Sequence, residues 1–371
     1  MEQSPKICVI VASHISLNNR IPHLITCLHH LFNQTSPVTV YLSISFKNDE
    51  LRTEVMNLLS VFSQQYPPDS FGIQNIFKEF PTNNAVTENG KELYFPKGGR
   101  GFEGEPGVPP IFSNKDKFIL KPRDSKTSQM KHISMALDEV KNDHDWIMFC
   151  DDDDTYDFTR VEKFLPLLQK GIAGAFESWV GMTQQKYRYE FWTYCVRPFV
   201  LMPFFEFLKD HPDILDQSCC DIMLVEYLRR LNPTAYRFLR LDIPENSPLY
   251  YYRKENNEYS ITEHIIKAQD KVRVGNPPEI TDVRFSDYIV EWNEYLYQNL
   301  HIYMHDVYLR TVVGCEFEYI LQKEFHVDYK YLEYVDPIHV ETLRRHHERV
   351  RDVCERLYQV WDLDSVGGTP G

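Results

Sequence analysis

The sequence predicts an α/β protein: a mostly parallel, Rossmann-like sheet with flanking helices, followed by a mainly helical carboxyl-terminal region. Two observations support this fold class. In the amino-terminal part, apolar runs rich in β-branched residues alternate with segments whose apolar residues recur at spacings of three and four. Short connections between such segments are typical of a parallel sheet wound with crossover helices. Beyond residue 262, the apolar residues recur almost entirely with helical spacing.

The first elements follow this alternation. Residues 6–12 are a continuous β-branched run, which predicts a buried strand. Residues 21–32 carry apolar side chains at helical spacing and predict the first helix. Residues 38–46 predict a second strand, and Asn48 is expected to cap a second helix that reaches about residue 66.

A long irregular segment then interrupts the pattern over residues 81–123. Its middle, residues 97–107, is rich in glycine and charge, so we expect a loop insert there. The glycines do not connect a strand directly to a helix, which argues against a phosphate-binding loop. A helix follows, with Ser125 or Thr127 as its expected cap, and its first part carries Lys131, where an anion could be held.

The most informative stretch is an apolar run, residues 146–150, that stops at four consecutive carboxylates, Asp151, Asp152, Asp153 and Asp154. Adjacent carboxylates raise one another's pKa unless a cation lies among them. Clustered oxygen ligands suit a hard divalent ion such as Mg²⁺ or Mn²⁺. Carboxylates at the carboxyl end of a buried strand also lie where open α/β sheets bind their ligands. We therefore predict a metal site at this junction; the alternative is a solvated acidic turn.

Further elements are expected after the acidic run. Residues 158–169 predict a helix, residues 172–176 a strand, and residues 222–231 an amphipathic helix. Residues 250–260 are a polar and aromatic loop. Four helical segments follow, at residues 265–272, 285–297, 301–325 and 340–361.

The composition argues against several classes of function. The formal net charge of −14 disfavours nucleic acid or an anionic membrane surface as the main partner, because binding to either needs a surplus of lysine and arginine. No segment approaches the roughly 20 apolar residues of a membrane span, and the amino terminus lacks the pattern of a signal peptide. The eight cysteines form no Cys-x-x-Cys pair and no zinc-binding spacing, so we expect reduced thiols in a cytoplasmic protein.

The order of these parts resembles the GT-A-fold glycosyltransferases, most closely the large inverting family that uses nucleotide-activated sugars. Residues 131–154 (KHISMALDEVKNDHDWIMFCDDDD) are similar to that family's helix and Asp-x-Asp strand. Residues 252–260 (YRKENNEYS) are similar to a loop that closes its catalytic domain. The likeness covers roughly residues 6–262, and the acidic segment is its specific part.

The resemblance, together with the helical pattern that follows it, predicts three parts. Residues 1–262 would form a GT-A-like nucleotide-sugar-binding and catalytic domain, with the loop insert at about residues 81–123. Residues 263–365 would form a helical carboxyl-terminal region. Residues 366–371 would be a flexible tail.

The family's site roles carry over by position. Asp151 and Asp153 would form the Asp-x-Asp pair, with Asp153 as the direct ligand of Mn²⁺ or Mg²⁺ and Asp151 nearer the donor ribose or sugar. Asp152 and Asp154 give a second frame one residue later, so Asp154 is a further candidate ligand and Asp152 a further donor-binding residue. The metal would bridge the donor diphosphate and neutralise charge on the leaving nucleotide. The remaining donor-binding candidates are Ala12, Ser13, Arg20, Arg123 and Lys131.

Asp221, ahead of a predicted helix, stands where the family keeps its catalytic base, and Asp216 is a second candidate. Inversion requires a carboxylate that takes the proton of the acceptor hydroxyl, whereas the alternative role of either residue is a helix cap. The chain departs from the family twice. The second strand ends in Leu-Ser-Ile-Ser-Phe, residues 42–46, without the aspartate that holds the base, and Glu255 and Asn256 stand near the position of a metal-binding histidine.

The sequence thus predicts a metal-dependent glycosyltransferase that moves a sugar from a nucleotide-diphosphate sugar, with UDP-sugar favoured, to a hydroxyl of a glycan or other acceptor, with inversion. One alternative is a sugar-phosphate nucleotidyltransferase on a similar fold, which the absence of glycine from residues 13–20 disfavours. The other is a catalytically silent protein that binds metal and nucleotide. The oligomeric state is left open.

Overall fold

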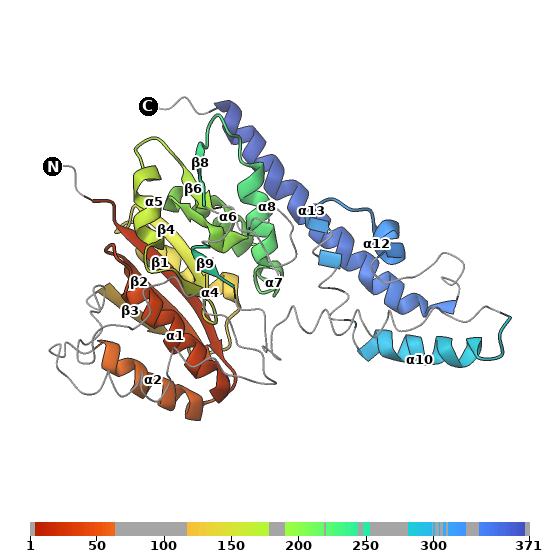
Figure 1. The fold of residues 1–371 in the computed structure, drawn as a ribbon. Coiled ribbons are helices and arrows are strands. Elements are labelled where there is room, and N and C mark those ends of the chain that lie inside the picture. Colours follow the sequence, from red (N-terminus) through yellow and green to blue (C-terminus); the bar gives the residue numbers. More distant parts are fainter. Residues whose placement is uncertain are drawn as a thin grey trace. The chain divides into compact units, whose positions relative to one another are not determined.

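The fold was analysed in a computed structural model of the 371-residue chain (Figure 1). The described residues are 4–63, 117–177, 190–218, 220–243, 248–252, 281–298, 300, 304, 307–308, 311–323 and 334–367. By its internal contacts the chain divides into two compact units. Unit 1 comprises Met1–Glu206 and Tyr236–Arg253, and unit 2 comprises Phe207–Ala235 and Lys254–Gly371.

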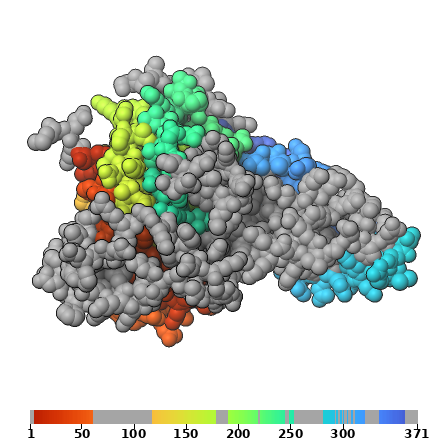
Figure 2. Space-filling view, in the orientation of Figure 1, coloured from red at the N-terminus to blue at the C-terminus, as the bar shows by residue number. Residues whose placement is uncertain are grey.

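Within its described residues, unit 1 is built on a seven-stranded sheet of order β3-β2-β1-β4-β7-β6-β8. The strands β1 to β4 are parallel, β6 and β8 are parallel to each other, and β7 runs antiparallel to both β4 and β6. Figure 2 shows the yellow-green and green segments that contain β6 and β8 side by side at the surface. The strands are β1 (Ile7–Ile15), β2 (Thr39–Phe46), β3 (Phe118–Pro122), β4 (Trp146–Asp151), β6 (Gly174–Glu177), β7 (Tyr194–Val196) and β8 (Phe238–Leu241).

Helices connect the parallel strands, as the sequence predicted. Asn48 accepts a hydrogen bond from the Leu51 N–H at 2.9 Å and caps the second helix, which confirms its expected role. In α1 the apolar residues at helical spacing, Leu24 and Leu28 among them, are fully buried. The helices and 3₁₀ turns of unit 1 are η1 (Asn18–Arg20), α1 (Ile21–Phe32), α2 (Asp49–Ser63), α4 (Gln129–Val140), α5 (Arg160–Phe164), η3 (Leu165–Leu167) and η4 (Phe191–Thr193), and α6 (Pro198–Lys209) begins in it. This arrangement is consistent with the GT-A-like α/β fold expected from the sequence.

The strand order places a topological switch point between β1 and β4. From β1 the chain steps to β2 and then to β3 in one direction, whereas β4 returns to the other side of β1. Ala12 lies opposite Asp151, the last residue of β4, and β1 continues past this pair to Ile15. Open α/β sheets bind ligands outside the carboxyl ends of their strands at such a point. The four carboxylates therefore follow β4 at the favoured ligand position of the sheet.

Two expected elements differ in extent. Residues 118–122 form β3 inside the segment expected to be irregular. This strand is short and only half-buried, and its pairing with β2 is a tertiary contact that local pattern does not reveal. The expected helix over residues 158–169 is also wrong in length, because α5 ends at Phe164 and a 3₁₀ turn follows. Pro166 lies in that turn and lacks the N–H that a continuing α-helix needs.

Two further boundaries are corrected. The helix α4 begins at Gln129 with Ser128 at its cap position, not with Ser125 or Thr127. The expected loop over residues 250–260 begins with a strand instead, because β9 (Tyr250–Tyr251) pairs antiparallel with β5 (Thr155–Tyr156). The remainder of that loop, and the glycine-rich part of the expected insert, lie outside the described residues.

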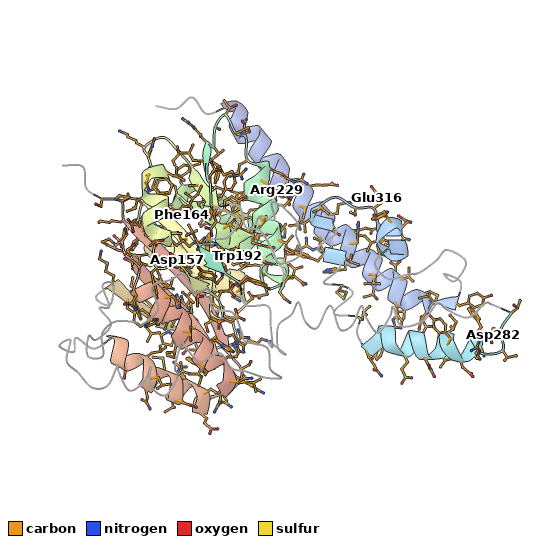
Figure 3. All side chains as sticks on the ribbon, viewed as in Figure 1. Asp157, Phe164, Trp192, Arg229, Asp282 and Glu316 are labelled. Atoms are coloured by element: carbon orange, nitrogen blue, oxygen red, sulfur yellow. The ribbon has the colours of Figure 1, made fainter. Side chains whose placement is uncertain are left out.

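Unit 2 is helical in its described residues, which confirms the expected character of the carboxyl-terminal region. Its helices bury an apolar cluster formed by Val307, Phe317, Ile320, Val335 and Leu343. Figure 3 shows Arg229 on α8, Asp282 ahead of α10 and Glu316 ahead of α12. The helices are α7 (Pro212–Leu215), α8 (Cys220–Arg230), α10 (Phe285–Gln298), α12 (Phe317–Lys323) and α13 (Pro337–Gly367).

The ends of the predicted parts need one correction. The helix α13 continues to Gly367, so the first two residues of the expected tail, 366–371, are helical, and residues 368–371 lie outside the described residues. The functional division at residue 262 stays a prediction. None of the helices in the described part of the chain combines the length and the apolar composition that a membrane crossing needs.

Candidate active site

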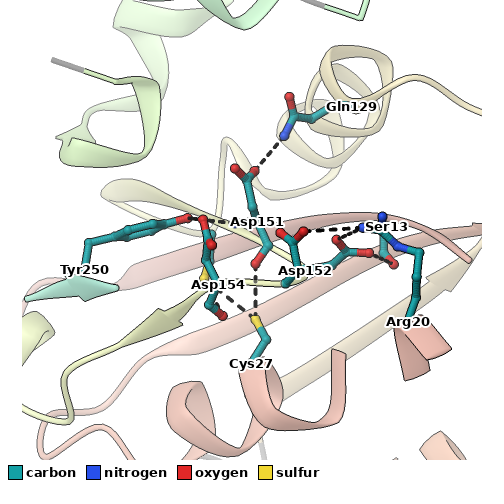
Figure 4. Close-up of polar contacts among 10 residues, drawn as sticks. Ser13, Arg20, Cys27, Gln129, Asp151, Asp152, Asp154 and Tyr250 are labelled. Carbon is teal, nitrogen blue, oxygen red and sulfur yellow. Dashed lines mark hydrogen bonds and ion pairs between the residues drawn. The ribbon is translucent and has the colours of Figure 1, made fainter. Parts of the chain in front are cut away.

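The four carboxylates form a turn at the end of β4, and we call residues 151–154 the acidic turn (Figure 4). The Asp154 N–H donates to the Asp151 carbonyl at 3.2 Å and closes the turn. The four side chains do not share one environment: Asp152 and Asp154 are buried, whereas Asp151 and Asp153 are partly exposed. The turn thus differs from the alternative of a solvated acidic turn in that two of its four carboxylates are buried.

Asp152 is held by two donors from the first strand and the turn that follows it. Its Oδ2 accepts from Ser13 Oγ at 2.6 Å, and its Oδ1 accepts from an Arg20 Nη at 2.7 Å. Ser13 lies in β1 and Arg20 ends η1, so these contacts join the carboxyl ends of β1 and β4. The Asp152 carboxylate raises the pKa of Arg20, which keeps that guanidinium charged.

Asp154 is anchored by Tyr250, a residue that the sequence analysis did not identify. The Tyr250 hydroxyl donates to Asp154 Oδ2 at 2.7 Å and accepts from the Asp151 N–H at 3.1 Å. Its ring stacks on Trp192 with centroids 3.9 Å apart, and the Arg160 guanidinium lies 5.0 Å from the ring centre. Burial raises the pKa of Tyr250 well above its usual value, so the hydroxyl remains a donor.

Asp151 and Asp153 are the members of the turn that solvent reaches. Asp151 Oδ1 accepts from Gln129 Nε2 at 2.6 Å, a contact from the first residue of α4 that the sequence analysis also missed. The Asp153 side chain is 18% exposed, and its Oδ2 lies 3.8 Å from an Arg20 Nη. Between the two frames that the sequence left open, this geometry favours the pair Asp151 and Asp153 for a ligand.

The other predicted site residues fall in several places. Ala12 lies beside Asp151 in the sheet, and Lys131 is exposed on α4 two residues after Gln129. Asp221 lies inside the first turn of α8 in unit 2, one residue after the helix begins at Cys220, so its expected place ahead of the helix is corrected. Asp216 is the C-cap residue directly after α7. Glu255 and Asn256 lie outside the described residues.

Arg123 is turned toward β2 and α4. Its Nε donates to Ser43 Oγ at 2.9 Å, one Nη donates to the Tyr41 hydroxyl at 3.2 Å, and the other lies 3.5 Å from Glu139. The structure thus brings Ser13 and Arg20 to the acidic turn but gives Arg123 a different set of contacts. Its expected role at the donor stays a prediction.

A group of buried polar side chains lies on β2, at the strand end where the resemblance led us to expect an aspartate. Ser43 and Ser45 are fully buried, and they contact the two ring nitrogens of His132 on α4, with Ser43 Oγ 2.8 Å from Nδ1 and Ser45 Oγ 3.1 Å from Nε2. Burial lowers the pKa of His132 to about 3, so the ring is neutral. His14 Nδ1 lies 2.9 Å from Ser45 Oγ and extends this group to β1.

The acidic turn suits a metal that binds together with its substrate. In the described residues, no three His, Cys, Asp or Glu side chains are grouped so that they could hold an ion. Mg²⁺ commonly binds through one or two carboxylates, several waters and substrate phosphates rather than in an all-protein cage. Asp151 and Asp153 fit such an open site, whereas the two oxygens of Asp152 already accept short hydrogen bonds.

No protein-family model matches the sequence, and no curated protein matches it either. Several solved structures are similar to the chain at low identity. S. aureus TarS 1–349 in complex with UDP-GlcNAc is 12% identical, with 95% of this chain and 92% of that chain covered and a TM-score of 0.39. The mannosyltransferase PcManGT from Pyrobaculum calidifontis in complex with GDP-Man and Mn²⁺ is 12% identical, with coverage of 97% and 88% and a TM-score of 0.38. The glycosyltransferase GlyE of Streptococcus pneumoniae is 10% identical, with coverage of 78% and 74% and a TM-score of 0.32.

Proposed function

We propose that this chain is a metal-dependent glycosyltransferase that moves a sugar from a nucleoside-diphosphate sugar to a hydroxyl group. The observation that carries the proposal is the acidic turn at the switch point between β1 and β4. Its two buried carboxylates are fixed by Arg20, Ser13 and Tyr250, and this leaves Asp151 and Asp153 as the pair that solvent reaches. A pair of partly exposed carboxylates at a ligand-binding edge suits a cation-bound anionic ligand better than a structural turn.

Asp153 and Asp151 would hold Mn²⁺ or Mg²⁺ in this proposal. When bound, the ion neutralises charge on the donor diphosphate and on the departing nucleotide. Because the chain carries a formal net charge of −14, a metal ion or a local basic cluster must offset its repulsion of a diphosphate, and the ion would serve this purpose. Asp154, whose side chain is 1% exposed and accepts the Tyr250 hydrogen bond, would hold the turn in shape rather than bind the ion itself.

Residues at the end of β1, at the end of η1 and in the first turn of α4 would line the donor. Ala12 and Ser13 stand at the carboxyl end of β1, and Arg20 brings a positive charge to the same edge. Lys131 exposes a second positive charge in the first turn of α4, close in sequence to the Gln129 that contacts Asp151. Together these groups would orient the nucleotide and its phosphates. A UDP-sugar is the favoured donor by resemblance to the family.

Asp221 is the proposed general base, with Asp216 as the second candidate. A carboxylate in that role accepts the proton of the acceptor hydroxyl as its oxygen attacks the anomeric carbon, and the sugar configuration is inverted. The acceptor would be a glycan or another molecule with a free hydroxyl. Replacement of Asp221 by Asn should lower kcat by roughly 10²- to 10⁴-fold and leave donor binding in place.

The test of the proposal is metal-dependent turnover of a nucleotide sugar. A panel of nucleotide sugars is incubated with the full chain and Mn²⁺, and release of the nucleoside diphosphate is measured. We expect turnover of one donor class, its loss in Asp153→Ala, and its retention in Asp124→Ala, where the replaced side chain is 95% exposed and belongs to a surface ion pair. Metal-dependent binding of a nucleotide without turnover, with or without an added glycan, would identify a silent binding protein instead. Absence of any binding would reject the proposal.

A further inference from the structure

A chain of hydrogen bonds crosses the face of β1 and β2 that α4 covers. It runs from Arg123 through Ser43, His132 and Ser45 to His14, with contacts of 2.9, 2.8, 3.1 and 2.9 Å. The middle three residues are buried, with Ser43 and Ser45 at 0% and His132 at 1% exposure. Buried hydroxyl and imidazole groups need a partner for every proton, so the positions of the protons along this chain are constrained.

Arg123 determines which group donates and which accepts in each hydrogen bond of this series. A guanidinium can only donate, so Ser43 Oγ accepts from Arg123 Nε. The hydroxyl proton of Ser43 then needs an acceptor, and His132 Nδ1, at 2.8 Å, supplies it. A neutral imidazole with Nδ1 as acceptor carries its proton on Nε2, so His132 donates to Ser45 Oγ.

The hydrogen bonds that Ser45 accepts determine that it donates to His14. Its oxygen accepts from His132 Nε2–H and, more weakly at 3.4 Å, from the backbone N–H of Thr127. Its own proton therefore goes to His14 Nδ1, 2.9 Å away. With Nδ1 as acceptor, the neutral His14 ring carries its proton on Nε2. The reverse direction would leave the hydroxyl proton of Ser43 with no acceptor among the described residues.

His14 ends this chain at the ligand edge of the sheet. Side chains two residues apart on a strand share a face, so His14 shares its face of β1 with Ala12, which lies opposite Asp151. The ring is half-buried, and in the described part of the chain its Nε2 makes no hydrogen bond. Burial, and then the nearby charges of Lys126 and Arg20, lower the pKa of His14, which keeps the ring neutral despite the charge of Asp152. A donor with a fixed direction thus stands beside the acidic turn.

We infer that His14 selects the nucleobase of the donor at the 4-position of a pyrimidine, because its Nε2–H is a fixed donor that pairs with the carbonyl of uracil there and not with the exocyclic amino group of cytosine. The inference rests on the proposed function, since it places the base of the same nucleoside diphosphate. Uracil presents a carbonyl oxygen at the position where cytosine presents an amino group, as thymine and cytosine do in DNA. UDP and CDP therefore form a matched pair that differs in this one group and its ring nitrogen.

We expect UDP to bind about tenfold or more tightly than CDP. With CDP, the His14 Nε2–H loses its hydrogen bond and faces the amino group of cytosine, which is also a donor. Binding is measured by calorimetry on the full chain with Mn²⁺ present. In His14→Phe, which keeps a ring but removes the donor, the preference should fall to about onefold. His144→Phe is the matched control, because His144 lies before the amino end of β4, away from the ligand edge. It should keep the preference.

The outcomes separate this inference from the proposed function. Metal-dependent binding of UDP and CDP with equal affinity, or an unchanged preference in His14→Phe, overturns the role of His14 while the nucleotide site stands. Absence of binding by UDP, CDP, GDP and ADP overturns both.

A second measurement directly tests the expected tautomers of His14 and His132. Long-range ¹H–¹⁵N spectra of protein labelled at histidine distinguish the Nε2–H from the Nδ1–H tautomer, and the variants His14→Phe and His132→Asn assign the signals. We expect the Nε2–H tautomer at both positions. In Arg123→Met the constraint on Ser43 is lost, so the His132 signals should shift toward a mixture of tautomers. An Nδ1–H tautomer at His14 in the unmodified chain contradicts the inference.

Discussion

The Tyr250 hydroxyl donates to Asp154 Oδ2 at 2.7 Å and spans the acidic turn, because the same oxygen accepts the Asp151 N–H at 3.1 Å. One phenol thus holds both ends of the four-carboxylate turn. The ring itself contacts both Trp192 and the Arg160 guanidinium. The conformation of the proposed metal site therefore depends on β9, which lies almost a hundred positions later in the chain.

Removal of this hydroxyl should loosen the turn without removing the ring. In Tyr250→Phe the buried Asp154 carboxylate loses a charge-assisted hydrogen bond, which typically contributes about 1.5–3 kcal/mol. We expect a decrease of that size in the free energy of unfolding, measured with urea, and weaker Mn²⁺-dependent stabilisation by UDP. The neighbouring Tyr251→Phe changes a half-buried phenol outside the turn and serves as the control. Equal Mn²⁺ responses in the two variants would show that the hydroxyl does not shape the site.

Acid should destabilise the protein through its buried histidines. Burial lowers the pKa of His132 to about 3, below the ordinary value of 6.5 that applies to the unfolded chain. Between these two pH values the unfolded state binds a proton that the folded state does not, so the free energy of unfolding falls as the pH falls through that window. The contribution is at most about 1.4 kcal/mol per pH unit for one group, and it is fully present above the unfolded pKa.

The measurement compares the unmodified chain with His132→Asn in urea at pH 7, 6 and 5. We expect the stability difference between them to shrink with acidification, because the variant has lost the group that resists protonation. His29, whose pKa burial also lowers to about 3, should show the same trend. Stability curves that stay parallel across this range would contradict the assignment of His132 as a buried neutral ring.

Loss of one partner of the buried ion pair near Tyr250 should greatly lower the stability of the protein, whereas replacement of both partners by apolar residues should lower it little. Arg160 lies 2.8 Å from Glu177, with side-chain exposures of 0% and 2%, and it also donates to the Trp192 carbonyl at 2.7 Å. Glu177→Gln would leave a buried guanidinium without its counter-charge, and such losses cost about 3–5 kcal/mol. The double variant Arg160→Met with Glu177→Leu should recover most of that stability in urea unfolding. A double variant no more stable than the single one would refute the ion-pair account.

Local pattern predicted the parts of the site that adjacent residues form. The apolar run of β4 and the carboxylates after it are contiguous, so the acidic turn and its position could be read from sequence, whereas Ser13 and Arg20 became candidates only through the resemblance. Tyr250 could not be predicted, because it meets Asp154 only through the pairing of β9 with β5. A two-residue strand of this kind carries no periodicity.

The buried hydrogen bonds of β2 with His132 also could not be predicted, because they join residues far apart in the sequence. Ser43 and Ser45 are 89 and 87 positions from His132, and the sequence shows only the absence of an expected aspartate. Their contact follows from the packing of α4 on the sheet. Arg123 is a donor-binding candidate by resemblance, whereas its hydrogen bonds to Ser43 and Tyr41 require the position of β2 to be known.

Variants at the neighbouring residues Asp152 and Asp153 should have different effects, one mainly on stability and the other mainly on metal binding. Both oxygens of Asp152 accept short hydrogen bonds from Ser13 and Arg20, so Asp152→Asn loses a charge-assisted contact and should lower the free energy of unfolding by about 1.5–3 kcal/mol. Asp153 is partly exposed, and its oxygen lies 3.8 Å from Arg20, so Asp153→Asn should change stability by less than about 1 kcal/mol.

Metal binding should follow the opposite order. Asp153→Asn removes a proposed ligand, so Mn²⁺ should no longer strengthen UDP binding, whereas Asp152→Asn should keep a weakened Mn²⁺ effect at temperatures where it remains folded. Titration of each variant with UDP, with and without Mn²⁺, measures this directly. If Asp152→Asn abolished the Mn²⁺ effect and Asp153→Asn retained it, the frame one residue later would be the metal-binding one. The buried hydrogen bonds of Asp152 would then have to open before the ion could bind, which predicts slow metal association.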